Sequence, residues 1–347
     1  MSEDYSKISD TAQLAPKKIL PKISAYIARM APQIAAMGAN EPFIIADYGA
    51  ADGANSSKPF GQIISQLRAI NPLLKIRLVY IDLAEPERFE KFWAASKLSS
   101  LENVEAQYIR RSFYEPLPEL AGRLRIGFSS TALHWLNAKT ADADFFKHPD
   151  CIQPCQLPDA ERRKFAQKWK EDFSLFLENC SLALAGGGAL FAANLTDLGG
   201  CNWPASAAYN NLRDICRELY NEKLLSLEEI TAVFVPSYFA TPDEFNSLLE
   251  KDRLKQLFTL NSLDILTAPC AYSAKMQNKL NAPEQKAELA DTLSRVVRAW
   301  SESSIRVGLS PAHKDMADEI YKRLREKFYA KPQALPYQYC LLELTRN

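Results

Sequence analysis

Short apolar runs alternate with amphipathic stretches along the first part of this chain. The apolar runs lie at residues 43–48, 76–81, 104–109, 124–130 and 189–195, as buried strands of a parallel sheet would. Apolar residues at helical spacing fill the segments between these runs, and the longest helical pattern covers residues 159–185. Alternating strands and helices predict an α/β fold, a doubly wound sheet with helices on both faces.

The alternation ends after residue 195. Residues 196–258 are mostly helical in pattern, and a strand at 260–267, helices at 284–304 and 310–328 and a strand at 337–344 follow. We therefore expect a core formed by residues 1–195 and 259–347 and an inserted, mostly helical cap of residues 196–258. Such a cap can exclude water and select the substrate. Aromatic candidates for its pocket wall are Trp203, Tyr209, Tyr238 and Tyr337.

Two helix boundaries are predicted from local signals. An amphipathic helix begins after Leu20 and precedes the first strand. The triple glycine at 186–188 predicts the end of the long helix, because glycine readily adopts the left-handed conformation found at helix termini.

The most informative turn follows the first strand. The apolar run ends at Asp47, glycines follow at 49 and 53, and the polar residues 55–57 are placed to cap the next helix. A strand, a glycine turn and a helix form the ligand-binding mouth of a doubly wound sheet. The spacing Asp-x-Gly-x-x-x-Gly differs from the dinucleotide fingerprint, and no Lys-Ser/Thr pair makes a P-loop. An acid at the strand end favours a cationic ligand over a phosphate.

Two other strand ends carry polar side chains. Asp82 follows the second strand, where an acid accepts hydrogen bonds from a ribose diol or caps the following helix. His134 and Trp135 follow the fourth strand. The Trp135 ring offers one N–H donor and the His134 ring a donor or an acceptor, so this pair can hold a carboxylate at the sheet mouth. The alternative is that both residues pack into the core.

Composition excludes several classes of function. Lysine plus arginine and aspartate plus glutamate both total 42, so the net charge is zero and nothing indicates a nucleic-acid or membrane partner. We expect a cytoplasmic protein, because we see no secretory signal, no apolar stretch of about 20 residues and only scattered cysteines, seven in number. His148, Cys151 and Cys155 lack a fourth ligand nearby, so we expect no metal site.

Several motifs occur in a characteristic order over nearly the whole chain. They are Ile45-Ala46-Asp47-Tyr48-Gly49 with Gly53 and Asn55, Ile81-Asp82-Leu83, Arg111-Ser112-Phe113-Tyr114, Ser129-Ser130-Thr131-Ala132-Leu133-His134-Trp135-Leu136, Asp172 to Leu177 before Gly186-Gly187, and Pro236 with Tyr238 and Glu244. Together they resemble the SABATH family of small-molecule carboxyl methyltransferases, which includes salicylate and jasmonate methyltransferases.

The resemblance implies a Rossmann-like class I methyltransferase fold, S-adenosylmethionine (SAM) as the methyl donor, S-adenosylhomocysteine (SAH) as its product, and a homodimer. The residues that it assigns to the SAM site are Ser9, Asp47, Gly49, Asn55, Asp82, Leu83, Ser112 and Phe113. The two acids, Asp47 and Asp82, would meet the amino-acid end and the ribose, and residues 112 and 113 the adenine. The residues that it assigns to the substrate pocket are Gln13, Thr131, His134 and Trp135.

The chain departs from the family pattern at three places. The family's substrate glutamine falls on Ala12, and Gln13 lies one residue later. The family's pocket tyrosine is Thr131 here, which removes an aromatic wall. Some members bind magnesium at a Phe-Asn pair; the chain has Val233-Phe234 instead, so we expect no metal there.

We therefore predict an enzyme that forms the methyl ester of a small-molecule carboxylic acid. A free carboxyl group has a pKa of about 4 and is already ionised, so positioning rather than a general base is expected to supply the catalysis. Two alternatives stay open: a related enzyme that methylates a nitrogen or hydroxyl of another small molecule, and a non-catalytic SAM-fold protein that binds a ligand.

Overall fold

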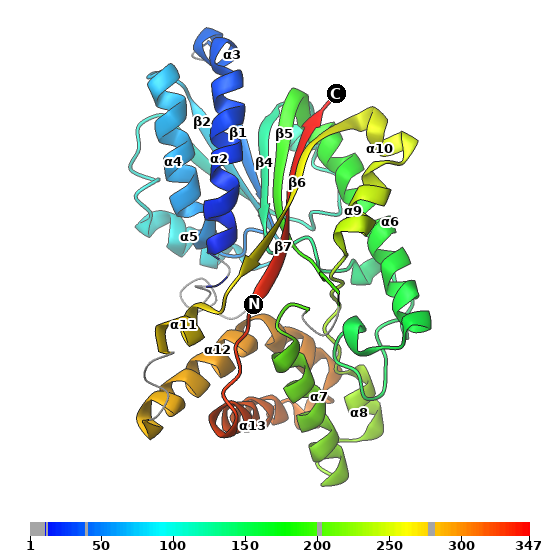
Figure 1. Cartoon of the computed structure of the whole chain (residues 1–347). Helices are drawn as coiled ribbons and strands as arrows, with labels where there is room; N and C mark the ends of the chain where they lie inside the picture. Colours follow the sequence, from blue (N-terminus) through cyan, green and yellow to red (C-terminus); the bar gives the residue numbers. More distant parts are fainter. Residues whose placement is uncertain (1–10, 12, 39–40, 200–202, 277–281) are drawn as a thin grey trace.

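The computed structural model describes residues 11, 13–38, 41–199, 203–276 and 282–347. Its centre is a seven-stranded sheet in the order β3-β2-β1-β4-β5-β7-β6 (Figure 1). The parallel strands are β1 (Phe43–Tyr48), β2 (Ile76–Asp82), β3 (Val104–Arg110), β4 (Leu124–Ser130) and β5 (Leu184–Leu195). The antiparallel strands are β6 (Phe258–Ala268) and β7 (Tyr337–Arg346). The predicted α/β fold is thus confirmed, and the strand order reverses between β1 and β4, where such sheets bind ligands.

Helices cover both faces of the sheet because successive strand residues point in opposite directions. Phe43 and Ile45 of β1 pack into the core cluster that contains α2 (Leu14–Arg29) and α4 (Ala54–Ile70), whereas Ile44 and Tyr48 join the cluster on the other face. The helices on that other face are α6 (Asp159–Ala183), α9 (Pro242–Leu249) and α10 (Asp252–Leu257). The shorter helices α3 (Ala31–Ala36) and α5 (Pro86–Ala95) lie on the α2 and α4 side (Figure 1).

A further helical layer lies beyond the carboxyl ends of the parallel strands (Figure 1). It contains α7 (Ser206–Asn221), α8 (Leu227–Ala232), α12 (Pro283–Gly308) and α13 (Met316–Ala330), with α11 (Ala271–Met276) beside it. These four helices share one apolar cluster, so the layer takes residues from two separate segments of the chain. The helices α9 and α10, from within the predicted cap, pack instead with the cluster around α6. The cap of residues 196–258 stays a prediction, to which we return below.

Two predicted boundaries are wrong. The first helix begins at Leu14 rather than after Leu20. The long helix ends at Ala183, and the glycines 186–188 lie inside β5, since Leu184 already has extended backbone angles. A β-carbon on Gly188 would lie 2.8 Å from the Leu124 carbonyl oxygen, so glycine allows β5 to approach β4 there.

The start of α4 also differs from the prediction. Gly53, in the left-handed conformation at φ +87°, precedes the helix, and no side chain caps its first turn. Asn55 and Ser56 therefore lie inside the helix rather than at its cap, and the Ser56 hydroxyl donates to the Gly53 carbonyl oxygen at 3.1 Å. This leaves the Asn55 side chain available for another purpose.

The turn after β1 contacts the turn after β4 through one glycine. Gly49 has φ +80°, and a β-carbon at this position would lie 2.2 Å from the β-carbon of Ala132. No side chain fits such a space, so the two turns meet only because residue 49 is glycine. This contact brings the residues that follow β1 next to the segment containing Thr131 and Trp135.

We predict that Gly49→Ala lowers the free energy of unfolding by about 3 kcal/mol, since it combines left-handed strain with overpacking. Gly122→Ala is the matched control, because Gly122 has φ +67° but open space around it; we expect it to cost about 1 kcal/mol. Urea denaturation measures both. Equal losses in the two variants would show that the contact with Ala132 contributes nothing.

Candidate active site

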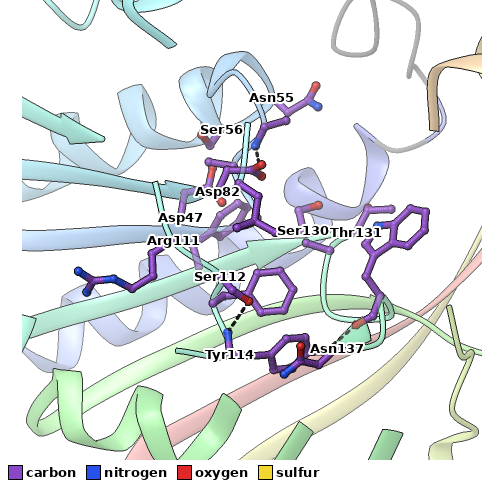
Figure 2. Close-up of a pocket in the computed structure, with 18 of the residues that line it drawn as sticks. Asp47, Asn55, Ser56, Asp82, Arg111, Ser112, Tyr114, Ser130, Thr131 and Asn137 are labelled. Carbon is purple, nitrogen blue, oxygen red and sulfur yellow. Dashed lines mark hydrogen bonds between the residues drawn. The ribbon is translucent and has the colours of Figure 1, made fainter. Parts of the chain in front are cut away.

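A cavity with a volume of about 290 Å³ opens at the carboxyl ends of β1, β2 and β4 (Figure 2). The predicted cofactor residues that line it are Asp47, Gly49, Asn55, Asp82, Leu83, Ser112 and Phe113. Ser9, the remaining one, lies outside the described residues. The strand ends thus bring together residues that are 66 positions apart in the sequence (47 to 113).

Asp47 is a buried carboxylic acid at the end of β1. Its side chain points toward the cavity near Ser56 and Asp82 (Figure 2), and the residue is only 4% exposed. Burial raises the pKa of the Asp47 carboxyl to about 7; a hydrogen bond with Ser56 opposes this, while the nearby carboxylates of Asp82 and Asp52 add to it. A group in this state gains most from a cationic ligand, which would supply the missing counter-charge.

Asn55 adds a second acceptor to the same cavity. Its side-chain oxygen is buried and has no hydrogen-bond partner among the described residues. An unpaired buried acceptor is costly, so it fits a ligand that brings an N–H or O–H donor. Together, Asp47 and Asn55 suit the ammonium end of an amino acid.

Asp82 is held by two backbone N–H groups. One carboxylate oxygen accepts from Ala51 N at 2.8 Å and the other from Ala84 N at 2.9 Å. A carboxylate has about four acceptor sites, so capacity remains for a pair of ligand hydroxyls. The alternative role as a helix cap is wrong, since Glu85 precedes α5 and no side chain caps that helix.

Apolar and polar groups alternate around the rest of this cavity. Leu83 is 58% exposed at the cavity wall, and Phe113 packs edge-on against Phe176 with ring centroids 6.0 Å apart. The Ser112 hydroxyl accepts from Tyr114 N at 3.2 Å, a turn that fixes residues 112–114 beside the cavity (Figure 2). Such a lining suits a planar apolar ring with polar edges.

A second, smaller cavity of about 30 Å³ adjoins the first. Its lining residues are Thr131, His134, Trp135, Leu195, Pro204, Ala205, Tyr209, Phe239, Trp300 and Tyr337. Thr131 and Trp135 line both cavities and so form their shared wall. Of the other predicted substrate residues, His134 lines the second cavity and Gln13 the first.

Thr131 is fixed at this wall in an uncommon conformation. Its φ is +60°, a left-handed value that is unfavourable for a β-branched residue. Its N–H donates to the Ala193 carbonyl oxygen at 2.8 Å, and its hydroxyl lies 3.2 Å from the Tyr339 hydroxyl. Strain held in this way is typical of functional sites.

His134 is buried and uncharged. Burial lowers the pKa of its imidazole to about 3, so at neutral pH it can donate or accept a hydrogen bond but brings no positive charge. Its ring lies 5.2 Å from the Trp135 ring, which is half-buried. Tyr114 OH donates to the Trp135 carbonyl oxygen at 2.5 Å and holds this segment in place.

Comparison with known proteins decides the family. A sequence model described as SAM dependent carboxyl methyltransferase matches residues 2–347. The chain belongs to this family. It is a SAM-dependent carboxyl methyltransferase, as the resemblance to SABATH enzymes predicts, and SAM is its methyl donor.

A solved structure shares the fold over the whole chain. A structure titled loganic acid methyltransferase with SAH has a TM-score of 0.73 and 16% identity, covering 100% of this chain and 97% of its own. The match to a structure of the MccD protein has a TM-score of 0.41 and 10% identity, and covers 94% of this chain and 96% of MccD. The match to geranyl diphosphate methyltransferase in complex with GPP and sinefungin has a TM-score of 0.37 and 10% identity, and covers 93% of this chain and 79% of that one. A search of curated proteins found no match.

The cavity residues of this methyltransferase fit SAM. Asp47 and the unpaired Asn55 oxygen suit its cationic amino-acid end, and Asp82 has the free acceptor capacity that a ribose diol needs. Phe234, one residue of the Val233-Phe234 pair, stacks on Phe165 with ring centroids 5.5 Å apart, and no group of three or more His, Cys, Asp or Glu side chains that could hold a metal occurs among the described residues. His148 and Cys151 instead make hydrogen bonds to backbone oxygens of residues 145 and 153.

Several residues around the site have no role predicted from the sequence, although Asp172 belongs to one of the motifs. A buried pair of Lys168 and Asp172 supports the wall of the first cavity, where Asp172 accepts from Asn137 N at 2.8 Å. Trp300, on α12, lines the second cavity and lies 164 residues after Leu136, where the motif around Trp135 ends (136 to 300). Trp300 lies on the ordinary apolar face of its helix, so no local signal could have identified it.

Of the four aromatic candidates for the pocket wall, two line a cavity and two do not. Tyr209 and Tyr337 line the second cavity. Trp203 packs against Tyr209 at 5.3 Å without lining either cavity, and the Tyr238 hydroxyl donates to the Glu244 carboxylate at 2.9 Å.

We predict that Asp47→Asn stabilises the ligand-free methyltransferase at pH 8. The raised pKa of Asp47 means that the folded state loses stability as pH rises from about 4 to about 7, and the cost, on the order of 2–4 kcal/mol, persists above that range. Asparagine removes this cost, so the difference in the free energy of unfolding between the variant and the wild type should shrink toward pH 4. Urea denaturation at pH 8 and pH 5 measures it. A variant that is less stable than wild type at pH 8 would contradict the account.

Proposed function

We propose that the chain transfers the methyl group of SAM to the carboxylate of a small-molecule acid that binds at the junction of the two cavities. The observation that supports this is the wall that the cavities share, Thr131 and Trp135. A donor in one cavity and an acceptor in the other would meet at this wall. Methyl transfer by in-line displacement requires just such an approach of two ligands from opposite sides.

The proposed cofactor contacts follow from the first cavity. Asp47 and Asn55 hold the amino-acid end of SAM, Asp82 holds the ribose hydroxyls, and residues 83, 112 and 113 surround the adenine. Gly49 keeps the turn close to the bound ligand. When bound, SAM supplies an electrophilic methyl group on a sulfonium; the chain supplies orientation and a site from which water is excluded.

The proposed acceptor contacts come from both cavities. The Trp135 ring N–H donates to the acceptor carboxylate, and Gln13, in the wall of the first cavity, provides a second polar contact. No residue is assigned the role of general base, because the acceptor acid is already ionised at neutral pH. Holding the carboxylate oxygen in line with the methyl group accounts for most of the rate enhancement.

We also propose a revised cap. Tyr209 of α7 and Trp300 of α12 both line the second cavity, so the cap that closes it takes residues from 203–240 and from 271–337. We make two further proposals. A homodimer rests on the family resemblance, and a cytoplasmic location rests on the scattered thiols of the sequence. The described cysteines are all free, and no described helix has the length and apolarity that a membrane crossing requires.

The first test is calorimetric titration with SAM and SAH. We expect micromolar binding to the wild type and a loss of at least about 100-fold in Asp82→Ala, which removes the ribose acceptor and also the support of the turn at Ala51. Methyl ester formation on a panel of carboxylic acids, followed by mass spectrometry, then identifies acceptors. Amines and phenols in the same panel are controls. Turnover of these compounds alone would show that the enzyme methylates a nitrogen or a phenol oxygen rather than a carboxylate.

A second test addresses the carboxylate contact. Trp135→Phe keeps an aromatic ring but removes its N–H, so we expect kcat/KM for the acid to fall about 10–100-fold, mainly through KM. The Kd for SAM should change less than about two-fold. Trp203→Phe is the control, since Trp203 lines neither cavity. An equal loss of SAM affinity in Trp135→Phe would contradict its role in binding the acceptor.

A further inference from the structure

Two residues that line the second cavity each have a buried nitrogen atom without a hydrogen-bond partner among the described residues. The two atoms are Nδ1 of His134 and Nε1 of Trp300. His134 is 5% exposed and Trp300 is 8% exposed, so water outside the protein does not serve them. Most buried polar atoms in proteins are paired, and each exception requires an explanation.

These two atoms belong to different parts of the fold. His134 follows β4, next to the proposed carboxylate contact Trp135, whereas Trp300 lies on α12 and packs against Tyr209 with ring centroids 4.9 Å apart. Core and cap thus each contribute one of these residues to the lining of the same small cavity. The rest of the lining is mostly apolar or aromatic, and no charged side chain occurs among the described residues that form it.

The chemistry of the two atoms restricts the group that would pair with them. The indole nitrogen of Trp300 can only donate, so its partner must have an acceptor atom. Nδ1 of His134 donates in one tautomer and accepts in the other. A hydroxyl group satisfies both atoms with either tautomer, because its oxygen accepts and its hydrogen donates.

Charged partners fit this cavity poorly. Burial keeps His134 neutral, and a second carboxylate there would have no cation among the described lining residues to balance it. A purely apolar group would leave both nitrogens unpaired. A neutral hydroxyl is therefore the group that the cavity favours.

We propose that His134 and Trp300 form a second polar subsite that recognises a neutral hydroxyl of the acceptor, so the preferred substrate is a hydroxy acid. This inference rests on the proposed function of the site, since it places the acceptor in the second cavity. Trp135 holds the carboxylate that is methylated, whereas His134 and Trp300 select among acids by binding a hydroxyl elsewhere on the same molecule.

The test uses sets of three acids with one carbon skeleton: the hydroxy acid, its unsubstituted parent and its fluoro analogue. Fluorine has nearly the size of a hydroxyl but cannot donate. We expect the wild type to prefer the best hydroxy acid over its parent and its fluoro analogue by at least about 30-fold in kcat/KM, since both alternatives leave buried polar atoms poorly paired. Equal rates across every set would overturn the proposal.

The matched variants are Trp300→Phe and Trp169→Phe. Both remove a buried indole N–H that has no partner among the described residues, but Trp169 packs in the core against Phe173 and lines neither cavity. We expect the preference for the hydroxy acid to fall below about 5-fold in Trp300→Phe and to persist in Trp169→Phe. An unchanged preference in folded Trp300→Phe would contradict the assignment. If that variant does not fold, the three-acid comparison in the wild type still decides.

SAM binding separates this inference from the function on which it rests. A wild type that binds neither SAM nor SAH would refute the proposed function. A wild type that binds SAM and methylates parent acids as fast as hydroxy acids would refute only the second subsite.

Discussion

The buried carboxyl group of Asp47 is the constraint on which the rest of the site depends. It lies at the end of β1, beneath the turn that Gly49 allows, and burial raises its pKa to about 7. A folded protein gains no stability from such a group, because its ionised form is poorly solvated and lacks a counter-charge. We infer that the cost is compensated when the cationic end of SAM binds. The same residue thereby explains both a local instability and the choice of ligand.

The neighbouring features serve to keep this arrangement open and rigid. Asp82 uses two backbone N–H groups to fix the turn at Ala51, and the contact between residues 49 and 132 fixes the segment after β4. That segment carries Thr131 and Trp135, the wall between the two cavities. The turn after β1 therefore positions both the proposed donor site and the proposed acceptor wall. The cap completes the second cavity with side chains from two distant segments.

The sequence was informative where function depends on local motifs. The strand ends carrying Asp47, Asp82 and Trp135 could be identified because each lies in a short pattern beside an apolar run, and the family follows from these patterns in order. The cap that we propose could not be predicted from local patterns, because its two segments are joined by apolar packing between residues 206–232 and 283–330. Trp300 belongs to that packing, and nothing near it in sequence marks it as a cavity residue. Gly186–Gly188 resembled a helix end, whereas the actual role of Gly188 depends on a backbone atom of β4.

The proton linkage of SAM binding tests the central claim most directly. Calorimetry at pH 7 in two buffers with different enthalpies of ionisation gives the number of protons released on binding. With a pKa of about 7, Asp47 is about half protonated before SAM binds, and pairing with a cation should ionise it fully. We expect the wild type to release about half a proton more than Asp47→Asn per SAM bound. Equal proton release in the two proteins would show that Asp47 does not pair with the cationic end of SAM.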